Sequence, residues 1–101
     1  MVTRESVSLR EICRRQTKRM FYVYVLNCNN NDLYIGYSDD LKQRFKAHTD
    51  GKVTSTKNKR PLRLIYYEGY IDKRDATKRE YFLKTGKQRE LLRKRLTYSI
   101  K

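Results

Sequence analysis

Two short runs of β-branched and aromatic residues, separated by an asparagine-rich segment, constrain the fold of this chain most. Residues 21–27 read FYVYVLN and residues 33–38 read LYIGYS, a composition typical of β-strands. Asn29, Asn30 and Asn31 lie between them, and asparagine tolerates the left-handed backbone angles of tight turns. The sequence therefore predicts a β-hairpin.

The register of this hairpin decides which tyrosines share a face of the sheet. With a loop of residues 28–30, Tyr24 lies opposite Tyr34 and Tyr22 lies opposite Gly36, so all four share one face. The opposite face is then mostly apolar and is expected to be core. Its residues are Phe21, Val23, Val25, Leu33, Ile35 and Tyr37. Ordinary aromatic cross-strand packing is the alternative explanation for the paired tyrosines.

The sequence that follows the hairpin, up to residue 96, predicts that the domain is small and of the α+β class. Asp39 and Asp40 supply N-cap and first-turn acids for a helix ending near Thr49. Asp72 can cap a second helix, which stops at Gly86. A third strand is expected at residues 62–70, and a short basic helix at residues 88–96. The order ββαβαα favours a three-stranded antiparallel sheet flanked by helices.

The first 19 residues differ in character from the remainder. They contain six basic and two acidic residues with little apolar periodicity, so we predict a basic flexible extension over residues 1–19 and a folded domain over residues 20–101. Cys13 and Cys28 form no metal-ligand pattern. No apolar segment has the length of a membrane span or the pattern of a secretory signal. We therefore expect a cytoplasmic protein with reduced thiols.

The charge of the chain points to a polyanionic partner. There are 25 Lys and Arg against 11 Asp and Glu, which gives a formal net charge of +14. Nucleic acid is the commonest partner of such a chain, and an anionic membrane surface is the rival. The basic residues cluster in residues 52–63 and in the tail from Lys84. We expect the two clusters to form a phosphate-binding rim, although solvated surface is the alternative. The expected phosphate-binding residues are Lys52, Lys57, Lys59 and Arg60.

Two polar residues lie on the apolar side of the first predicted helix. Leu41, Arg44, Phe45 and His48 share one stripe, so Arg44 and His48 are expected beside the core. A guanidinium is a rigid fork of donors suited to phosphate, and a histidine could carry a proton or bind a phosphate oxygen. The alternatives are an ion pair for Arg44 and a satisfied packing role for His48.

An acid on the second predicted helix is a candidate metal ligand. Glu80 shares a stripe with Ala76 and Leu83 and should therefore lie near the core side. Mg²⁺ binds through as few as one or two carboxylates and completes its shell with water and substrate phosphate. A salt bridge to Arg44 or an i,i+4 pair with Lys84 is the structural alternative.

Taken in order, these residues resemble the signature of the GIY-YIG nuclease superfamily. Tyr22-Val23-Tyr24 is followed, after nine residues, by Tyr34-Ile35-Gly36, and Arg44 and Glu80 stand in the next two helices. The resemblance covers about residues 20–96 and is greatest to the short, single-domain bacterial members. The YIG motif alone is weak evidence, whereas the ordered set with Arg-x-x-x-His and Glu is strong.

The resemblance implies an endonuclease that hydrolyses DNA phosphodiester bonds with one Mg²⁺ or Mn²⁺ ion. Glu80 would hold the ion, and Arg44 would stabilise the developing negative charge. Tyr24 or Tyr34 would help to activate the attacking water, with neighbouring cations favouring the phenolate, and His48 is a possible second proton carrier. Tyr22 and Gly36 are expected to lie against the nucleic acid.

Other functions fit part of the same pattern. A non-catalytic nucleic-acid-binding module would keep the basic rim and the stacking tyrosines. A strand transferase would use a tyrosine nucleophile, and a structural protein of a ribonucleoprotein would prefer RNA. We expect a monomer that acts on DNA, with RNA left open, without a membrane or a small-molecule cofactor. Structure-selective cleavage in DNA repair or recombination is the expected setting.

Overall fold

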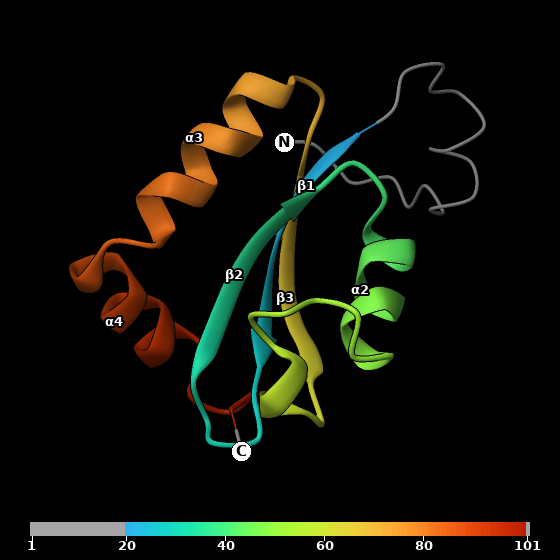
Figure 1. Cartoon of the computed structure of the whole chain (residues 1–101). Helices are drawn as coiled ribbons and strands as arrows, with labels where there is room; N and C mark the ends of the chain where they lie inside the picture. Colours follow the sequence, from blue (N-terminus) through green and yellow to red (C-terminus); the bar gives the residue numbers. More distant parts are fainter. Residues whose placement is uncertain (1–19, 101) are drawn as a thin grey trace, which may run out of the picture.

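A three-stranded antiparallel sheet forms the centre of the computed structural model, which describes residues 20–100 (Figure 1). Strand β1 (Phe21–Asn27) lies in the middle, between β2 (Leu33–Ser38) and β3 (Arg63–Tyr70). The predicted α+β class and the three-stranded sheet are confirmed. The predicted extension over residues 1–19 lies outside the described residues.

The helices cover both faces of the sheet. Helix α2 (Leu41–Thr49) lies on one side, and α3 (Lys73–Leu83) and α4 (Gly86–Arg95) lie on the other (Figure 1). A 3₁₀ turn, η1 (Lys57–Lys59), interrupts the loop between α2 and β3. Each sheet face is therefore buried by a different part of the chain, as expected for a small layered domain.

Helix starts and stops follow local chemistry. The Asp40 side chain accepts a hydrogen bond from the Gln43 backbone N–H, and Asp72 accepts one from Arg74, so both predicted N-caps are confirmed. Gly51 follows α2 with φ of 77°, a conformation that glycine adopts without strain. Helix α4 begins at Gly86, two residues before the predicted start.

The hairpin register differs from the prediction by two residues. The loop comprises five residues, 28–32, and is closed by a 2.9 Å hydrogen bond from the Cys28 N–H to the Asp32 carbonyl. Asn31 takes the left-handed conformation within it, with φ of 66°. Tyr24 consequently pairs with Gly36, and Leu26 pairs with Tyr34. Because side chains alternate with a period of two, this shift leaves every residue on its predicted face.

Two separate cores result. The face with α3 and α4 buries Val23, Val25, Leu33 and Ile35 against Ala76, Leu83 and Leu92, as predicted for the apolar side of the hairpin. The opposite face buries a smaller cluster under α2. That cluster contains Tyr24, Leu26, Cys28 and Leu62, with Leu41 and Phe45 packed on it. The second core thus contains Tyr24, a candidate catalytic residue from the sequence. Among the described residues, no helix combines the length and the apolar character needed to cross a membrane.

Candidate active site

The ring of Tyr24 crosses β2 at Gly36. An added Cβ at Gly36 would lie only 2.4 Å from both Cζ and Oη of Tyr24, far inside van der Waals contact. Glycine at this position therefore makes room for the phenol. Gly36 is buried and faces the tyrosine ring, which is a different environment from the nucleic-acid contact that the sequence suggested.

The hydroxyl of Tyr24 is held by two residues of α2. It lies 2.9 Å from Nε2 of His48, and it accepts a 3.4 Å hydrogen bond from Nε of Arg44. Tyr24 is only 1% exposed, so solvent does not compete for these contacts. The two polar residues on the inner stripe of α2 therefore converge on one phenol.

His48 is a buried, fully paired histidine. Its exposed fraction is 0%, and Nδ1 lies 2.8 Å from Oγ1 of Thr56. Burial, with a further contribution from the positive charge of Arg44, lowers the pKa of His48 to about 4. The imidazole is therefore neutral at pH 7, with one nitrogen donating and the other accepting. The packing alternative from the sequence describes its environment correctly.

Tyr34 and Arg44 form the accessible part of the site. The Tyr34 ring is half-buried, with its centroid 6.4 Å from that of Tyr24 and 5.1 Å from that of His48. Arg44 is exposed, and its hydrogen bond to Tyr24 raises the pKa of its guanidinium. The salt bridges between residues 20–100 do not include Arg44. Its charge is thus available to an anion.

The pKa of the Tyr24 hydroxyl is raised in the fold. Burial raises the pKa of its hydroxyl, and the charges of Tyr34 and Glu80 raise it further, whereas Arg44 lowers it. Arg44 therefore favours the phenolate, as predicted, but burial outweighs it and the net shift is upward. Desolvation of the anion outweighs one exposed guanidinium here, and Tyr24 is a phenol at neutral pH.

Glu80 lies on α3, which packs on β1 and β2 from the face opposite α2 (Figure 1). Its negative charge acts on the pKa values of both Tyr24 and Tyr37. The side chain is 22% exposed, and Oε2 lies 3.1 Å from Nζ of Lys84, the i,i+4 pair considered from the sequence.

The donor set suits a weakly held hard cation. Residues 20–100 contain no group of three or more His, Cys, Asp or Glu side chains that could hold a metal ion. A single accessible carboxylate such as Glu80 is enough for Mg²⁺, which keeps several waters and uses substrate phosphate as a ligand. The residues present therefore fit one ion shared with a substrate rather than a permanently bound metal.

A family model described as the GIY-YIG catalytic domain matches residues 20–95. The chain belongs to the GIY-YIG family. This is the family that the ordered set of Tyr24, Tyr34, Gly36, Arg44 and Glu80 predicted, and it is a family of nucleases. The match spans all seven elements of the described fold.

Several bacterial proteins are similar to this GIY-YIG domain over most of its length. The UPF0213 protein YazA of Bacillus subtilis is 43% identical over 79 residues, which cover 75% of this chain and 79% of the relative. A UPF0213 protein of Clostridium perfringens is 37% identical over 83 residues, covering 81% and 89% of the two chains. A UPF0213 protein from Bacillus halodurans, whose solution NMR structure is known, is 33% identical. The match covers 72% of this chain and 81% of that chain, with a TM-score of 0.49.

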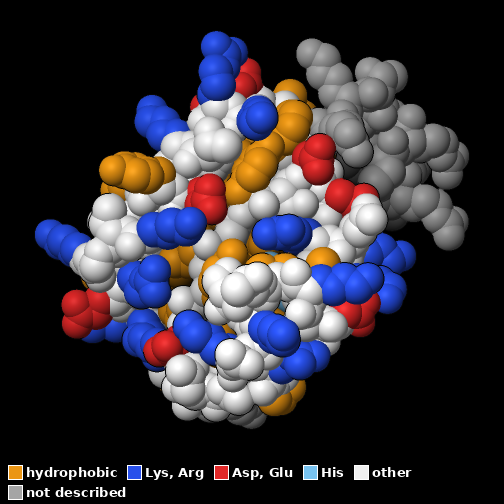
Figure 2. All heavy atoms as spheres, in the orientation of Figure 1, with side chains coloured by type: hydrophobic (Ala, Val, Ile, Leu, Met, Phe, Trp, Pro, Cys, Tyr) orange, Lys and Arg blue, Asp and Glu red, His pale blue; other side chains and the backbone are white. Residues whose placement is uncertain are grey.

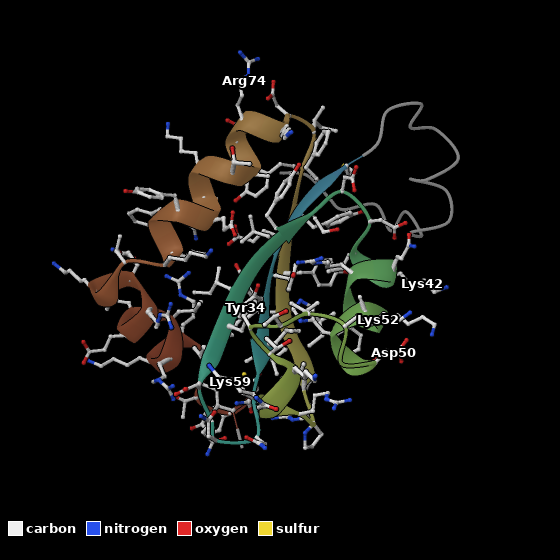
Figure 3. All side chains as sticks on the ribbon, viewed as in Figure 1. Tyr34, Lys42, Asp50, Lys52, Lys59 and Arg74 are labelled. Atoms are coloured by element: carbon white, nitrogen blue, oxygen red, sulfur yellow. The ribbon has the colours of Figure 1, made fainter. Side chains whose placement is uncertain are left out.

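The loop between α2 and β3, residues 50–62, which we call the basic loop, lies beside the buried histidine, because Thr56 belongs to it. Lys52 and Lys57 are exposed, and Lys59 is half-buried. In Figure 3, Lys52 lies beside α2, and Lys59 is the last residue of η1. Lys and Arg side chains are also spread across the face shown in Figure 2 rather than gathered in one patch.

Arg60 has a structural environment that separates it from these lysines. Its Nε donates to the Lys57 carbonyl at 2.9 Å, and its guanidinium lies against Gly51, where an added Cβ would approach it to 2.8 Å. The Asn29 side chain donates to the Arg60 carbonyl at 2.8 Å. Arg60 therefore ties the basic loop to the end of α2 and to the hairpin.

One polar network escaped the sequence analysis. Glu68 on β3 accepts two hydrogen bonds from Arg79, at 2.9 and 3.1 Å, and one each from Tyr66 and Tyr70. Burial raises the pKa of Glu68, but these donors outweigh it and lower the pKa overall. Through Arg79, the residue before Glu80, the network attaches α3 to strand β3. Two features of the sequence could have indicated this network: Glu68 is an acid within a largely apolar strand, and Arg79 lies on the same helix stripe as Ala76 and Leu83.

Proposed function

We propose that this domain is a divalent-metal-dependent endonuclease that hydrolyses phosphodiester bonds of DNA. The observation that carries the proposal is the cluster at the edge of β2. It combines the exposed guanidinium of Arg44, which donates to Tyr24, the half-buried phenol of Tyr34, and Glu80, a carboxylate whose charge acts on Tyr24. A positioned cation, a hydrogen-bonding group for water and one metal-binding carboxylate are the parts that phosphodiester hydrolysis needs.

Three residues would touch the substrate or the metal. Arg44 would bind the scissile phosphate and stabilise the negative charge that develops on it. Tyr34, the phenol accessible to solvent, would orient the attacking water. Glu80 would hold one Mg²⁺ or Mn²⁺, which when bound would supply stabilisation of the leaving oxygen.

Tyr24 and His48 would act as positioning residues. Because His48 is neutral, its Nε2 can accept a hydrogen bond from the Tyr24 hydroxyl while its Nδ1–H donates one to Thr56. The Tyr24 oxygen then accepts from Nε of Arg44. This arrangement would orient the guanidinium without placing a charge inside the core, and it assigns His48 no direct contact with the phosphate.

Recognition of DNA shape rather than base sequence suits this design. The exposed lysines of the loop after α2 would contact phosphates, and phosphate contacts carry no direct sequence information. Structure-selective cleavage by a cytoplasmic monomer in DNA repair or recombination is the setting that we propose for such an enzyme.

The decisive experiment compares purified protein on labelled single-stranded, duplex, flap and branched DNA. Each reaction contains Mg²⁺, Mn²⁺ or EDTA, and each is repeated with Glu80→Gln and with Glu90→Gln, a control at an exposed acid of α4. We expect metal-dependent nicking by the parent and by Glu90→Gln, and none by Glu80→Gln. Cleavage by Glu80→Gln at the parent rate would exclude Glu80 as the metal ligand.

A non-catalytic nucleic-acid-binding module is the second candidate. The observation that favours it is the ion pair between Glu80 and Lys84, which satisfies the carboxylate without a metal. In that case the parent would bind every DNA in the panel without cutting any, and Glu80→Gln would bind as the parent does.

A further inference from the structure

A concave surface lies on the same sheet face as Tyr24 and Tyr34. It occupies about 640 Å³ between the N-terminal end of α2 and strands β1 and β3. We call it the tyrosine groove. Its principal lining residues are Tyr22, Tyr67, Phe45, Leu41, Asp39 and Asp40.

The groove adjoins the candidate active site. Tyr67 on β3 is the direct cross-strand partner of Tyr24, and directly paired residues have Cβ atoms about 5 Å apart. Tyr22 precedes Tyr24 by two residues on the same face of β1, a displacement of about 7 Å along the strand. A nucleotide next to a phosphate bound at Arg44 would therefore have the groove within reach.

The walls of the groove suit a flat aromatic group. The rings of Tyr22 and Tyr67 meet edge to face, with centroids 6.1 Å apart and planes at 64°. Tyr67 nevertheless remains 50% exposed, so part of its ring is open to a ligand. Phe45 and Leu41 line the same groove from α2. Nucleobases stack on such aromatic surfaces with little dependence on sequence.

The acidic groups at the groove should favour binding of a nucleobase over binding of a phosphate. Asp39 and Asp40 place negative charge there, which repels the backbone but accepts hydrogen bonds from the amino and imino groups of bases. One Asp40 oxygen already caps α2 through the Gln43 N–H, at 3.1 Å, and a carboxylate has capacity for more than one donor. Lys42, which also lines the groove, is exposed and supplies a cation for the adjoining phosphate.

We propose that the tyrosine groove binds one unpaired nucleobase of the DNA beside the cleavage site. The inference rests on the proposed nuclease function and narrows its substrate class to DNA with an unpaired base, such as a bulge, gap or flap. A base inside a matched duplex would first have to leave the stack, which disfavours intact duplex as a substrate.

The test measures binding without cleavage. A duplex with a single unpaired 2-aminopurine and its fully paired counterpart are titrated with protein in EDTA, by anisotropy and by 2-aminopurine fluorescence. The variants are Tyr67→Ala and Tyr67→Phe. Tyr81→Ala is the control, since Tyr81 is a 79% exposed tyrosine on α3, on the other side of the sheet.

We expect the parent to bind the bulged DNA about tenfold more tightly than the paired DNA and to quench the 2-aminopurine, as stacking on an aromatic ring would. Tyr67→Ala should lose most of this preference, whereas Tyr67→Phe and Tyr81→Ala should keep it. Equal binding of both DNAs by the parent, or an unchanged preference in Tyr67→Ala, would overturn the proposal.

The same reagents separate this inference from the nuclease proposal. In Mg²⁺, cleavage of bulged and paired DNA by Tyr67→Ala at parental rates would reject the groove and leave the nuclease intact. A parent protein that never cuts, yet prefers the unpaired base in EDTA, would reject the nuclease and leave the groove as a recognition site.

Discussion

The hydroxyl of Tyr24 lies 2.9 Å from Nε2 of His48, and the same imidazole reaches Oγ1 of Thr56 at 2.8 Å through Nδ1. All three side chains are at most 1% exposed. The basic loop that carries Thr56 is thereby connected to the phenol that holds Arg44. Changes in the loop should consequently affect the site through buried hydrogen bonds rather than through charge alone.

Replacing Thr56 by valine should uncouple this chain of contacts. The substitution keeps the shape but leaves Nδ1 of His48 without its partner, and an unsatisfied buried polar group costs about 1–3 kcal/mol. We expect that loss in urea unfolding, together with roughly tenfold slower single-turnover cleavage, since small misplacements of catalytic groups are costly. Thr56→Ser retains the hydroxyl and should remain close to the parent. Equal stability of the valine variant and the parent would contradict the assignment.

The stability of the protein should fall as pH drops from 6.5 towards 4. A histidine in an unfolded chain titrates near 6.5, whereas the pKa of His48 in the fold is about 4. Between these values the unfolded state binds the proton and the folded state does not, so protonation favours unfolding. Above pH 6.5 the contribution of His48 is fully present.

His48 is the only histidine in the chain, which makes this pH dependence easy to assign. The slope should approach about 1.4 kcal/mol per pH unit, the largest value for one proton. Urea unfolding at pH 7.5, 6.5, 5.5 and 5.0 measures it. His48→Gln should flatten the profile over this range, and an equally steep profile in that variant would assign the slope to other groups.

A methyl group at Gly36 should displace Tyr24. The added Cβ would lie 2.4 Å from Cζ and Oη of the tyrosine, and such overpacking typically costs about 1–3 kcal/mol. Gly36→Ala should lose that stability and most of its cleavage, because Tyr24 could no longer hold Arg44. Gly86→Ala is a matched control, since an added Cβ there meets nothing within 4 Å. Parental activity in Gly36→Ala would show that the Tyr24 position is dispensable.

The sequence predicted the tyrosine face correctly even though its register was wrong. The loop length at residues 28–32 could not be read from three consecutive asparagines, any of which can adopt left-handed angles. A two-residue error leaves side-chain faces unchanged, so Tyr24 and Tyr34 were still expected together. The 3.6-residue periodicity likewise predicted that Arg44 and His48 share one side of the helix, where His48 is buried and the exposed Arg44 reaches Tyr24.

Contacts between distant elements were beyond sequence reasoning. The pairing of His48 with Thr56 depends on how the basic loop folds back over α2, and that of Glu68 with Arg79 depends on where α3 crosses the sheet. The pKa direction of Tyr24 was also inaccessible, because it follows from a balance between burial and Arg44 that requires coordinates. Sequence periodicity predicts which face of a helix or strand a side chain occupies. Its partner on another element can be identified only from the folded structure.

Removing Lys84 should strengthen the affinity of the site for a divalent cation. Its ammonium lies 3.1 Å from Oε2 of Glu80 and competes for the carboxylate. Lys84→Met should lower the Mg²⁺ concentration that gives half-maximal cleavage by about fivefold, consistent with roughly 1 kcal/mol between neighbouring charges in water. Lys78→Met removes an exposed lysine from the same helix and serves as the control. An unchanged Mg²⁺ requirement in Lys84→Met would argue against Glu80 as the ligand.

Neutralising the lysines of the basic loop should weaken DNA binding in a salt-dependent way. Lys52 and Lys57 are exposed, and removing one phosphate-binding lysine should reduce the slope of log affinity against log salt by about 0.9. Lys52→Ala and Lys57→Ala should each show this change in fluorescence anisotropy titrations between 50 and 200 mM salt, about the usual range for such measurements.

Arg74→Ala supplies the control for these two variants. Arg74 is exposed and points away from the fold at the far end of α3 (Figure 3), where it pairs with Asp72 at 2.8 Å. Its removal should leave the salt slope unchanged. Arg60→Ala should instead reduce stability, because Arg60 ties the loop to α2. If Arg74→Ala lowered the slope as much as Lys57→Ala, the binding surface would extend over α3, and the basic loop would lose its special role.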